Sequence, residues 1–185
     1  MGKAFLLASI IIINLGWSNL LTNGNFEQPL TTGWLRDSNV TVNFIIDRAT
    51  HYDPDSDFEA QVYKWTGTGY AKLYQRVDIP SVQLAFSCNT KLIATTTSST
   101  CWAGTALVIG YLNAGNTRLG ETMICARTPA CPWQNTPTRH LRIAPDTLWR
   151  NYAFNISDEL TNLPGVNPSQ IARIEIALYS ECYSG

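Results

Sequence analysis

Apolar and polar residues alternate along most of this chain, with the period of two that is typical of strands half buried in a sheet. In the segment 170–179, apolar residues occupy positions 172, 174, 176 and 178, and charged or aromatic residues occupy positions 173, 175 and 179. Similar runs cover residues 40–47, 58–65, 70–78, 82–88, 91–97, 119–125, 139–144 and 149–156. Since the pattern contains no sustained helical period, it predicts an all-β chain.

Two parts of the pattern depart from simple alternation. Residues 101–113 form the longest apolar run and predict a central strand buried on both faces, where Gly104 and Gly110 allow close packing. The runs 82–88 and 91–97 predict either a pair of strands or one long bent strand. Together with the even spacing of the other runs, these features predict an antiparallel two-sheet β-sandwich.

The predicted sandwich begins with residues 19–27, which read as a short strand followed by a turn at Asn23 and Gly24. Phe26 is expected to anchor this stretch in the core, and Trp34 to close it. Trp149 is expected to be a second core tryptophan.

A basic start at residues 1–3 precedes an apolar run at residues 4–15, which is the layout of a secretory signal peptide. Small residues before the predicted cleavage point near Ser18 divide the chain into a signal peptide, 1–18, and one domain, 19–185. A membrane anchor is disfavoured because the run is shorter than the roughly 20 residues of a spanning helix. The alternative is that its β-branched part pairs as a strand, including as a donor strand in another subunit.

Length and charge narrow the class of protein further. A chain of 185 residues can form one β-sandwich but not two domains with large cores. With 45% hydrophobic and 15% charged residues, the chain is globular rather than disordered. Its formal net charge is −1 and it has no basic run, so nucleic acid is excluded as a partner, because phosphate contacts need clustered Lys and Arg.

Five cysteines suit an oxidising compartment and agree with export. Cys125 and Cys131 bracket a short loop that a disulfide can close. Cys88 and Cys101 flank two strand-like runs and are the next expected pair, which leaves Cys182 over. A secreted or cell-surface location is therefore expected.

A zinc site is not expected, because the chain has no Cys-x-x-Cys motif and His51 and His140 are remote in sequence. Asn39 and Asn155 each begin an Asn-x-Ser/Thr sequon. Both are predicted glycosylation sites in a host that has this machinery.

Several motifs, in this order, resemble those of secreted carbohydrate-binding modules with the galactose-binding-like jelly-roll fold. They are NLLTNGNFE…GW at the start, GYAKLYQRVDIP, VQLAFSC, LWRNYAFNI, and IARIEIALYS near the end. The resemblance covers most of residues 19–185 and implies a β-jelly roll whose partner is a polysaccharide or another glycan.

The end of the chain departs from that family, whose domains usually finish with one more strand that follows an acid pair. Here the sequence stops at Gly185, shortly after the penultimate strand. The expectation is either missing sequence or a sheet gap filled from elsewhere, such as by the N-terminal apolar run of a neighbour. Cys182 would then find its partner either in the missing sequence or in the neighbouring subunit. A strand supplied by a neighbour would make the chain a homo-oligomer or filament subunit.

Structural calcium is the cofactor that the resemblance implies, because in the family an acid just after the first strand contributes, and Glu27 stands in that place. Asp53, Asp55 and Asp57 alternate through a loop and can supply further oxygen ligands. The loop lacks the glycine and the distal glutamate of an EF-hand. The alternative is a solvated acidic loop, with Glu27 capping a turn.

Sugar binding is suggested by aromatic and basic residues that fall opposite the core pattern, since aromatic faces stack on pyranose rings and Arg binds hydroxyls. The predicted ligand-binding residues are Tyr63, Trp65, Tyr74, Arg76, Tyr111, Trp133, Arg173 and Tyr179. The alternative is that such aromatics pair across strands or cover a subunit contact.

Catalysis is not predicted, because the acidic and histidine residues form no recognisable nucleophile or metal motif. Asp158 and Glu159 are expected to start a helical turn at residues 158–163, where negative charge is favourable. The sequence thus predicts a secreted, non-catalytic glycan-binding module with structural calcium. The alternative is a surface or filament subunit assembled by donor-strand complementation.

Overall fold

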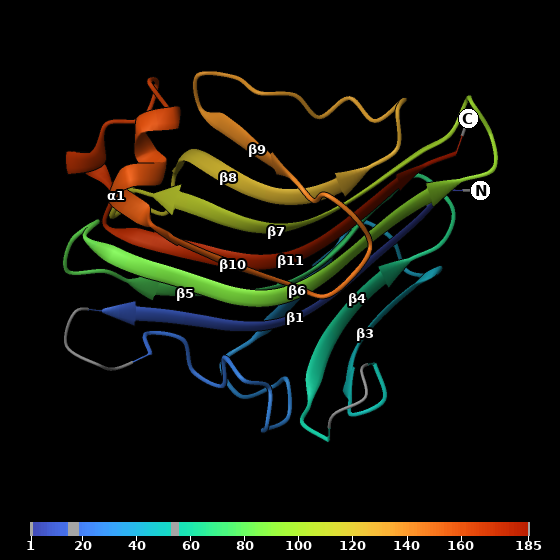
Figure 1. Ribbon diagram of the computed structural model, residues 1–185, viewed down its shortest axis with the longest axis horizontal. Helices are drawn as coiled ribbons and strands as arrows, with labels where there is room; N and C mark the ends of the chain where they lie inside the picture. The colour runs from blue at the N-terminus through green and yellow to red at the C-terminus, as the bar shows by residue number, and fades with distance from the viewer. Residues whose placement is uncertain (1, 15–18, 53–55, 185) are drawn as a thin grey trace.

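The computed structural model describes residues 2–14, 19–52 and 56–184, which form two stacked β-sheets (Figure 1). The five-stranded sheet A has the order β10-β6-β1-β4-β3, and the six-stranded sheet B has the order β2-β5-β11-β7-β8-β9. The predicted two-sheet β-sandwich is confirmed.

The strands of sheet A are β10 (Arg150–Asn155), β6 (Leu84–Thr96), β1 (Gly2–Asn14), β4 (Glu59–Lys64) and β3 (Phe44–Ala49). Those of sheet B are β2 (Leu35–Ser38), β5 (Gly69–Asp78), β11 (Arg173–Tyr183), β7 (Trp102–Leu112), β8 (Arg118–Arg127) and β9 (Arg139–Ile143). A short helix, α1 (Ile156–Glu159), and 3₁₀ turns at Leu160–Asn162 and Pro168–Gln170 cover one end, where a helical turn is predicted (Figure 1). Residues 84–96 form the single long strand, one of the two predicted options.

The pairings among the described strands are antiparallel, except that β9 runs parallel to β8. The loop 128–138 between them contains three prolines, which cannot donate to a ladder, and it carries the chain back to the start of β8. The sequence pattern alone does not reveal this crossover.

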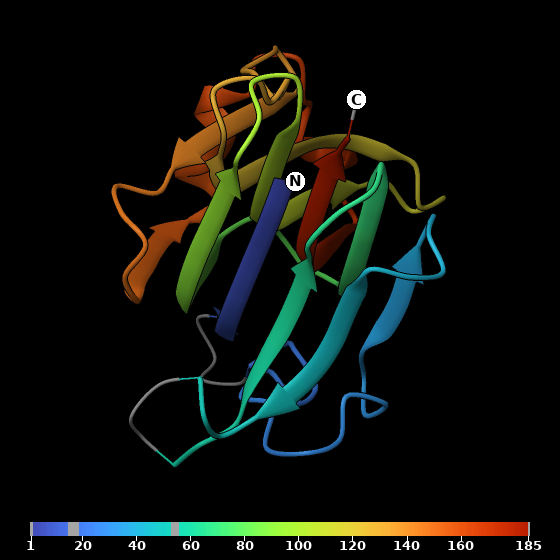
Figure 2. The same ribbon diagram turned by 90° about the vertical axis from the view of Figure 1, so that its right-hand side faces the viewer.

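The N-terminal run lies in the middle of sheet A as β1, between β6 and β4 (Figure 2). Its 13 residues pair with β6 from Gly2 opposite Thr96 to Asn14 opposite Leu84. The side chains of Ala4, Leu6 and Ala8 are fully buried. The N-terminal run therefore pairs as a strand, which is the alternative to a signal peptide, and it pairs within its own chain. The predicted cleavage point near Ser18 lies outside the described residues, and the signal peptide stays a prediction.

The stretch 19–27 does not form the predicted short strand but a series of turns. Asn23 and Phe26 have φ angles of 52° and 57°, in the left-handed region, which breaks any extended conformation. The side chain of Asn23 closes the turn by accepting from the Gln28 N–H at 2.9 Å. Phe26 and Trp34 nevertheless lie in the core as expected, with ring centroids 5.0 Å apart.

This turn is fastened to sheet B by Gln75 of β5. The Gln75 side chain accepts from Thr22 N–H at 2.8 Å and donates to Thr22 C=O at 2.9 Å. Two motifs on which the family resemblance rests, at residues 19–27 and 69–80, are therefore in direct contact.

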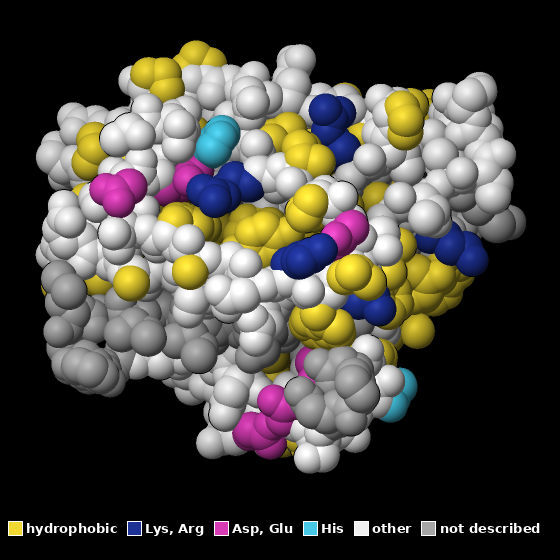
Figure 3. Space-filling view, viewed as in Figure 1, with side chains coloured by type: hydrophobic (Ala, Val, Ile, Leu, Met, Phe, Trp, Pro, Cys, Tyr) yellow, Lys and Arg dark blue, Asp and Glu magenta, His cyan; other side chains and the backbone are white. Residues whose placement is uncertain are grey.

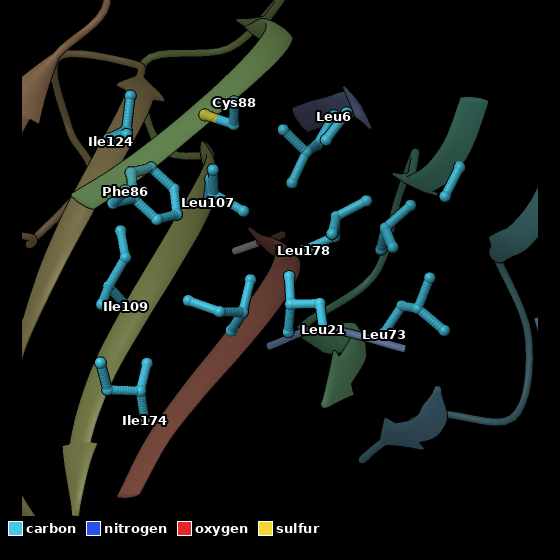
Figure 4. Packing of buried hydrophobic residues seen from close by; sticks show 14 of the residues in the cluster. Leu6, Leu21, Leu73, Phe86, Cys88, Leu107, Ile109, Ile124, Ile174 and Leu178 are labelled. Carbon is cyan, nitrogen blue, oxygen red and sulfur yellow. The ribbon is translucent and has the colours of Figure 1, made fainter. Parts of the chain in front are cut away.

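The core fills the space between the sheets (Figure 4). Leu6 and Phe86 of sheet A meet Leu107 and Leu178 of sheet B, and Leu21 of the N-terminal turn lies beside them (Figure 4). Trp149 is only half buried, because it stands immediately before the edge strand β10.

All five cysteines are buried, and Cys88, Cys125, Cys131 and Cys182 are thiols, so neither predicted disulfide is present. Cys88 lies mid-strand in β6, whereas Cys101 follows the far end of that strand. At roughly 3.3 Å per residue they are about 25 Å apart, far beyond the ~7 Å Cα separation that a disulfide allows. Cys125 and Cys131 do pack in one apolar cluster, as thiols. The Cys182 thiol is fully buried and faces the Gly2 carbonyl oxygen at 3.3 Å.

Removing part of β1 tests whether this strand belongs to the folded protein. Leu6→Ala in the chain 1–185 is expected to lower the free energy of unfolding by about 2–5 kcal/mol, because a fully buried leucine leaves a cavity. Urea unfolding measures the change. The control Leu35→Ala, at a side chain 58% exposed, is expected to stay within about 0.5 kcal/mol of the parent. Equal free energies of unfolding for the Leu6 variant and the parent would show that β1 is not part of the folded sandwich.

Candidate functional site

The outer face of sheet B carries a hollow of about 210 Å³, which we call groove B. Residues of β5, β7, β8, β9 and β11 line it together with Trp133 of the loop 128–138, because alternate residues of each strand point away from the core. Its lining residues are Lys72, Val108, Arg118, Glu121, Met123, Trp133, Arg139, Glu175, Ala177, Tyr179 and Glu181.

Small residues on β7 make the hollow possible. A Cβ on Gly104 would lie 2.6 Å from the Trp133 ring, and one on Gly110 would lie 2.5 Å from the Arg118 guanidinium. The indole and the guanidinium therefore lie directly on the strand backbone. The register between β7 and β8 shifts at Tyr111 and Leu112, a bulge-type irregularity that brings Arg118 to this place.

A buried carboxylate organises the charges of groove B. The side chain of Glu175 is 1% exposed and is paired with three cations: Arg76 Nε at 2.8 Å, Lys72 Nζ at 3.6 Å, and Arg118. Burial alone would raise the pKa of Glu175, but Arg118, Arg76 and Lys72 together hold this pKa below its usual range. Glu175 is thus ionised at neutral pH.

The other two carboxylates of the groove also have partners. Glu121 is paired with Arg118 at 2.8 Å and with Arg139 at 2.6 Å. Glu181 accepts from the Trp133 indole N–H at 3.3 Å. The described lining thus contains three cationic and three anionic side chains, so their formal charges sum to zero.

Aromatic rings wall one side of this groove. Tyr179 lies between Tyr70 and Trp133, with ring centroids 5.5 Å and 6.0 Å away. Burial and the neighbouring Glu181 raise the pKa of Tyr179, so its hydroxyl stays protonated at neutral pH. Tyr74 stands beside the groove, under the Lys72 ammonium at 4.3 Å from its ring centroid.

Of the predicted ligand-binding residues, Tyr74, Arg76, Trp133 and Tyr179 lie together on this outer face. Arg173 lies at its end, where its guanidinium pairs with Asp78 at 2.5 Å and with the Asn116 side chain at 2.8 Å.

Tyr63 and Trp65 lie on the opposite side of the sandwich, in and just beyond β4 of sheet A. Placing Tyr111 on an outward face was wrong, because its side chain is fully buried between the sheets. Its hydroxyl is hydrogen-bonded to that of Thr122 at 3.0 Å. Tyr111 shares the inward parity of Leu107 and Ile109, which an apolar run without alternation does not reveal.

The predicted ligand-binding residues include none of the six described charged residues that line groove B. Lys72 and Glu175 do stand at outward positions of alternating strands, so a pattern signal existed for them. Arg118 depends on the register shift in β8, and Arg139 on the parallel pairing of β9. Neither leaves a trace in the spacing of apolar residues.

A second buried carboxylate, Glu159 in α1, lies away from the groove. It binds Arg142 Nη1 at 2.7 Å, the Thr122 hydroxyl at 3.1 Å, and His140 Nδ1. Figure 3 shows a histidine beside acidic and basic side chains at this edge, at upper left. The acid predicted to favour the start of a helical turn thus also joins β9 to the helix.

The expected calcium ligands are brought together only in part. The Glu27 carboxylate accepts from Phe58 N–H at 3.2 Å, which places it at the backbone of the residue that follows Asp57. Asp53 and Asp55 lie outside the described residues. Within the described ranges, no group of three or more potential ligand side chains surrounds a common point. The predicted glycosylation residues Asn39 and Asn155 are both exposed.

Comparison with known proteins finds a distant structural match. No protein-family profile and no curated protein match the sequence. Among solved structures, the enzymatically active domain of tailspike protein 4 of bacteriophage CBA120 matches with a TM-score of 0.47 and 16% identity. The match covers 88% of this chain and 19% of that one. The family resemblance therefore stays a prediction. In the described part of the chain, no helix is long and apolar enough to span a membrane.

This neighbour corrects one expectation. It is described as an enzymatically active domain, which contradicts the prediction that the present chain is not an enzyme, and that prediction does not stand. At this TM-score and identity, the likeness itself assigns no reaction to the chain.

The charges around Glu175 predict that the folded protein loses stability at acidic pH. Because the pKa of Glu175 is lower in the folded chain, its stabilising effect is present above its ordinary value of 4.5 and is lost as the pH falls below it. Glu175→Gln is expected to cost about 2–3 kcal/mol at pH 7, less than a fully buried pair because the cations are partly in water. It should also flatten the loss of stability below pH 4.5.

Urea unfolding between acid and neutral pH measures both effects. The control is Asp78→Asn, which breaks an ion pair at a carboxylate 79% exposed and is expected to cost less than about 1 kcal/mol. Equal costs for the two variants would contradict the assigned role of Glu175.

Proposed function

We propose that this chain is an extracellular glycan-binding β-sandwich that holds a neutral sugar in groove B. The observation that carries the proposal is the combination of an aromatic wall, Trp133 and Tyr179, with compensated buried charges around Glu175. Such a surface offers both kinds of contact that a sugar ring requires.

The charge balance favours an uncharged, hydroxyl-rich ligand. Sugar hydroxyls both donate and accept hydrogen bonds, so they can bind to Lys72, Arg118 and Arg139 and also to the carboxylates of Glu121 and Glu181. Because these charges already neutralise each other, a ligand can displace water without leaving an unpaired buried charge.

The size of the groove limits the bound part of the ligand. A hollow of about 210 Å³ is smaller than the ~300–1,000 Å³ of typical pockets for drug-sized ligands. We therefore infer that one sugar unit enters groove B and that the rest of the glycan extends over the sheet. The ion pairs fix the side chains before binding, which lowers the entropic cost of ordering them.

The second candidate function is a structural surface or filament subunit. It is favoured by one observation, that a 13-residue N-terminal strand completes sheet A. A strand of this kind can be supplied by a neighbour. Since here the chain provides it to itself, glycan binding is the stronger proposal. A monomer by size-exclusion chromatography agrees with glycan binding, and a polymer favours the filament.

A glycan array followed by titration calorimetry tests the main proposal. The intact chain is expected to bind neutral glycans, and Trp133→Ala to weaken binding about tenfold or more, because it removes an aromatic wall. Trp65→Ala, the same change on the opposite sheet, is the matched control and should leave this affinity unchanged. Reducing ends measured in the same samples report any cleavage. Equal losses in both variants, or no neutral glycan bound, would end the proposal.

We further propose that calcium binds at Glu27 and Asp57 as a structural ion. Oxygen ligands of this type hold calcium in extracellular modules with Kd values of roughly 0.1–1 mM. At about 1 mM calcium, a Kd near 0.1 mM adds about 1.4 kcal/mol to stability. Thermal unfolding with calcium and with a chelator measures this, and Glu27→Gln should cancel the difference whereas Asp78→Asn should retain it. No calcium dependence in the parent chain would refute the site.

A further inference from the structure

A second groove, which we call groove A, lies on the outer face of sheet A, on the other side of the sandwich from groove B. It has a volume of about 410 Å³ and is lined by Lys3, Phe5, His51, Tyr52, Tyr63, Lys91, Ile93 and Thr95. Figure 3 shows a hydrophobic patch with basic side chains at its edge, at right over β4 and the start of β1.

The floor of groove A is a row of apolar side chains across three strands. Phe5 of β1 lies opposite Tyr63 of β4 on one side and Ile93 of β6 on the other. The rings of Phe5 and Tyr63 meet edge to face, with centroids 5.1 Å apart, and Trp65 extends the row 5.4 Å from Tyr63. This row offers flat aromatic surface to the apolar face of a ring-shaped ligand.

One wall of groove A is fixed by hydrogen bonds. The Tyr52 hydroxyl donates to the Asp47 carboxylate at 2.7 Å, and Gln61 Oε1 lies 3.2 Å from the same hydroxyl. Burial and this bond to Asp47 raise the pKa of Tyr52, so the phenol stays neutral and the bond is kept. The Asp47 carboxylate, which is not part of the groove lining, is thereby already hydrogen-bonded to Tyr52.

Among the described residues that line groove A, the charged side chains are basic. Lys3 and Lys91 belong to this set, and no described carboxylate does. Within the described ranges, neither lysine forms a salt bridge, in contrast to Lys72, Arg118 and Arg139 of groove B. The two faces of the sandwich therefore favour ligands of different charge.

We propose that groove A binds a carboxylate-bearing sugar unit of an acidic polysaccharide. The aromatic row around Tyr63 takes the apolar face of the ring, and Lys3 and Lys91 take its carboxylate. This site is independent of groove B, so the chain binds a neutral and an acidic glycan on opposite faces.

Other occupants fit groove A less well. In a two-fold contact between copies of this chain, the same patch would face itself, and two lysines from each copy would meet like charges. Nucleic acid requires a larger cluster of cations than the two lysines here.

The test compares polygalacturonate with its methyl-esterified form, which has the same rings without the charge. The intact chain is expected to bind polygalacturonate in calorimetry and to bind the ester at least about tenfold more weakly. Lys91→Gln and Tyr63→Ala should each weaken binding to polygalacturonate about tenfold. Arg36→Gln, which removes an exposed cation on β2, is the matched control and should have little effect.

Three results would overturn the proposal. They are equal binding of acid and ester, equal effects of Lys91→Gln and Arg36→Gln, and binding to none of polygalacturonate, alginate and hyaluronate. Binding to vesicles of anionic phospholipid alone, or a dimer that Tyr63→Ala dissociates, would assign the face to a membrane or to a second copy instead. Trp133→Ala should leave binding to polygalacturonate intact, so a failure of groove B is distinguishable from a failure of groove A.

Discussion

The burial of two apolar sheet faces against each other is the constraint on which the rest of this molecule depends. Each strand has a period of two, so filling the core with one set of side chains sends the other set outward. Leu6 and Phe86 meet Leu107 and Leu178 in the core, and the positions between them become available for chemistry. Both grooves are therefore products of core packing, since they consist of the residues that the core excludes.

The outer faces differ because their strands differ in side-chain size and in charge compensation. On β7, the glycines under Trp133 and Arg118 lower the surface enough for a hollow that ion pairs then surround. On sheet A, the aromatic side chains of Phe5 and Tyr63 cover the strands, and the described lining of groove A adds Lys3 and Lys91 but no carboxylate. The described linings of the two grooves thus differ in charge: that of groove B contains both signs, and that of groove A contains two lysines.

Strict alternation in β5 and β11 made the outward positions of Tyr74, Arg76 and Tyr179 predictable from the sequence. The same rule fails for Tyr111, because a strand that is apolar on both faces has no parity signal. The partners of Glu175 come from β5 and β8 and depend on strand order, which periodicity does not encode. The N-terminal run was ambiguous for a physical reason, since a leader peptide and a central strand both require apolar residues.

The position of β1 gives the biosynthesis of this chain an unusual order. The ribosome makes residues 2–14 first, but their partner β6 ends only at Thr96. At roughly 5–20 residues per second, this strand waits on the order of 10 s for its neighbour. Over that interval the run is an unpaired apolar segment, available to a chaperone or a translocation channel. Pairing of β1 with β6 is therefore a late step of folding, and until Thr96 is made the apolar side chains of this strand lack the neighbour that covers them in the sandwich.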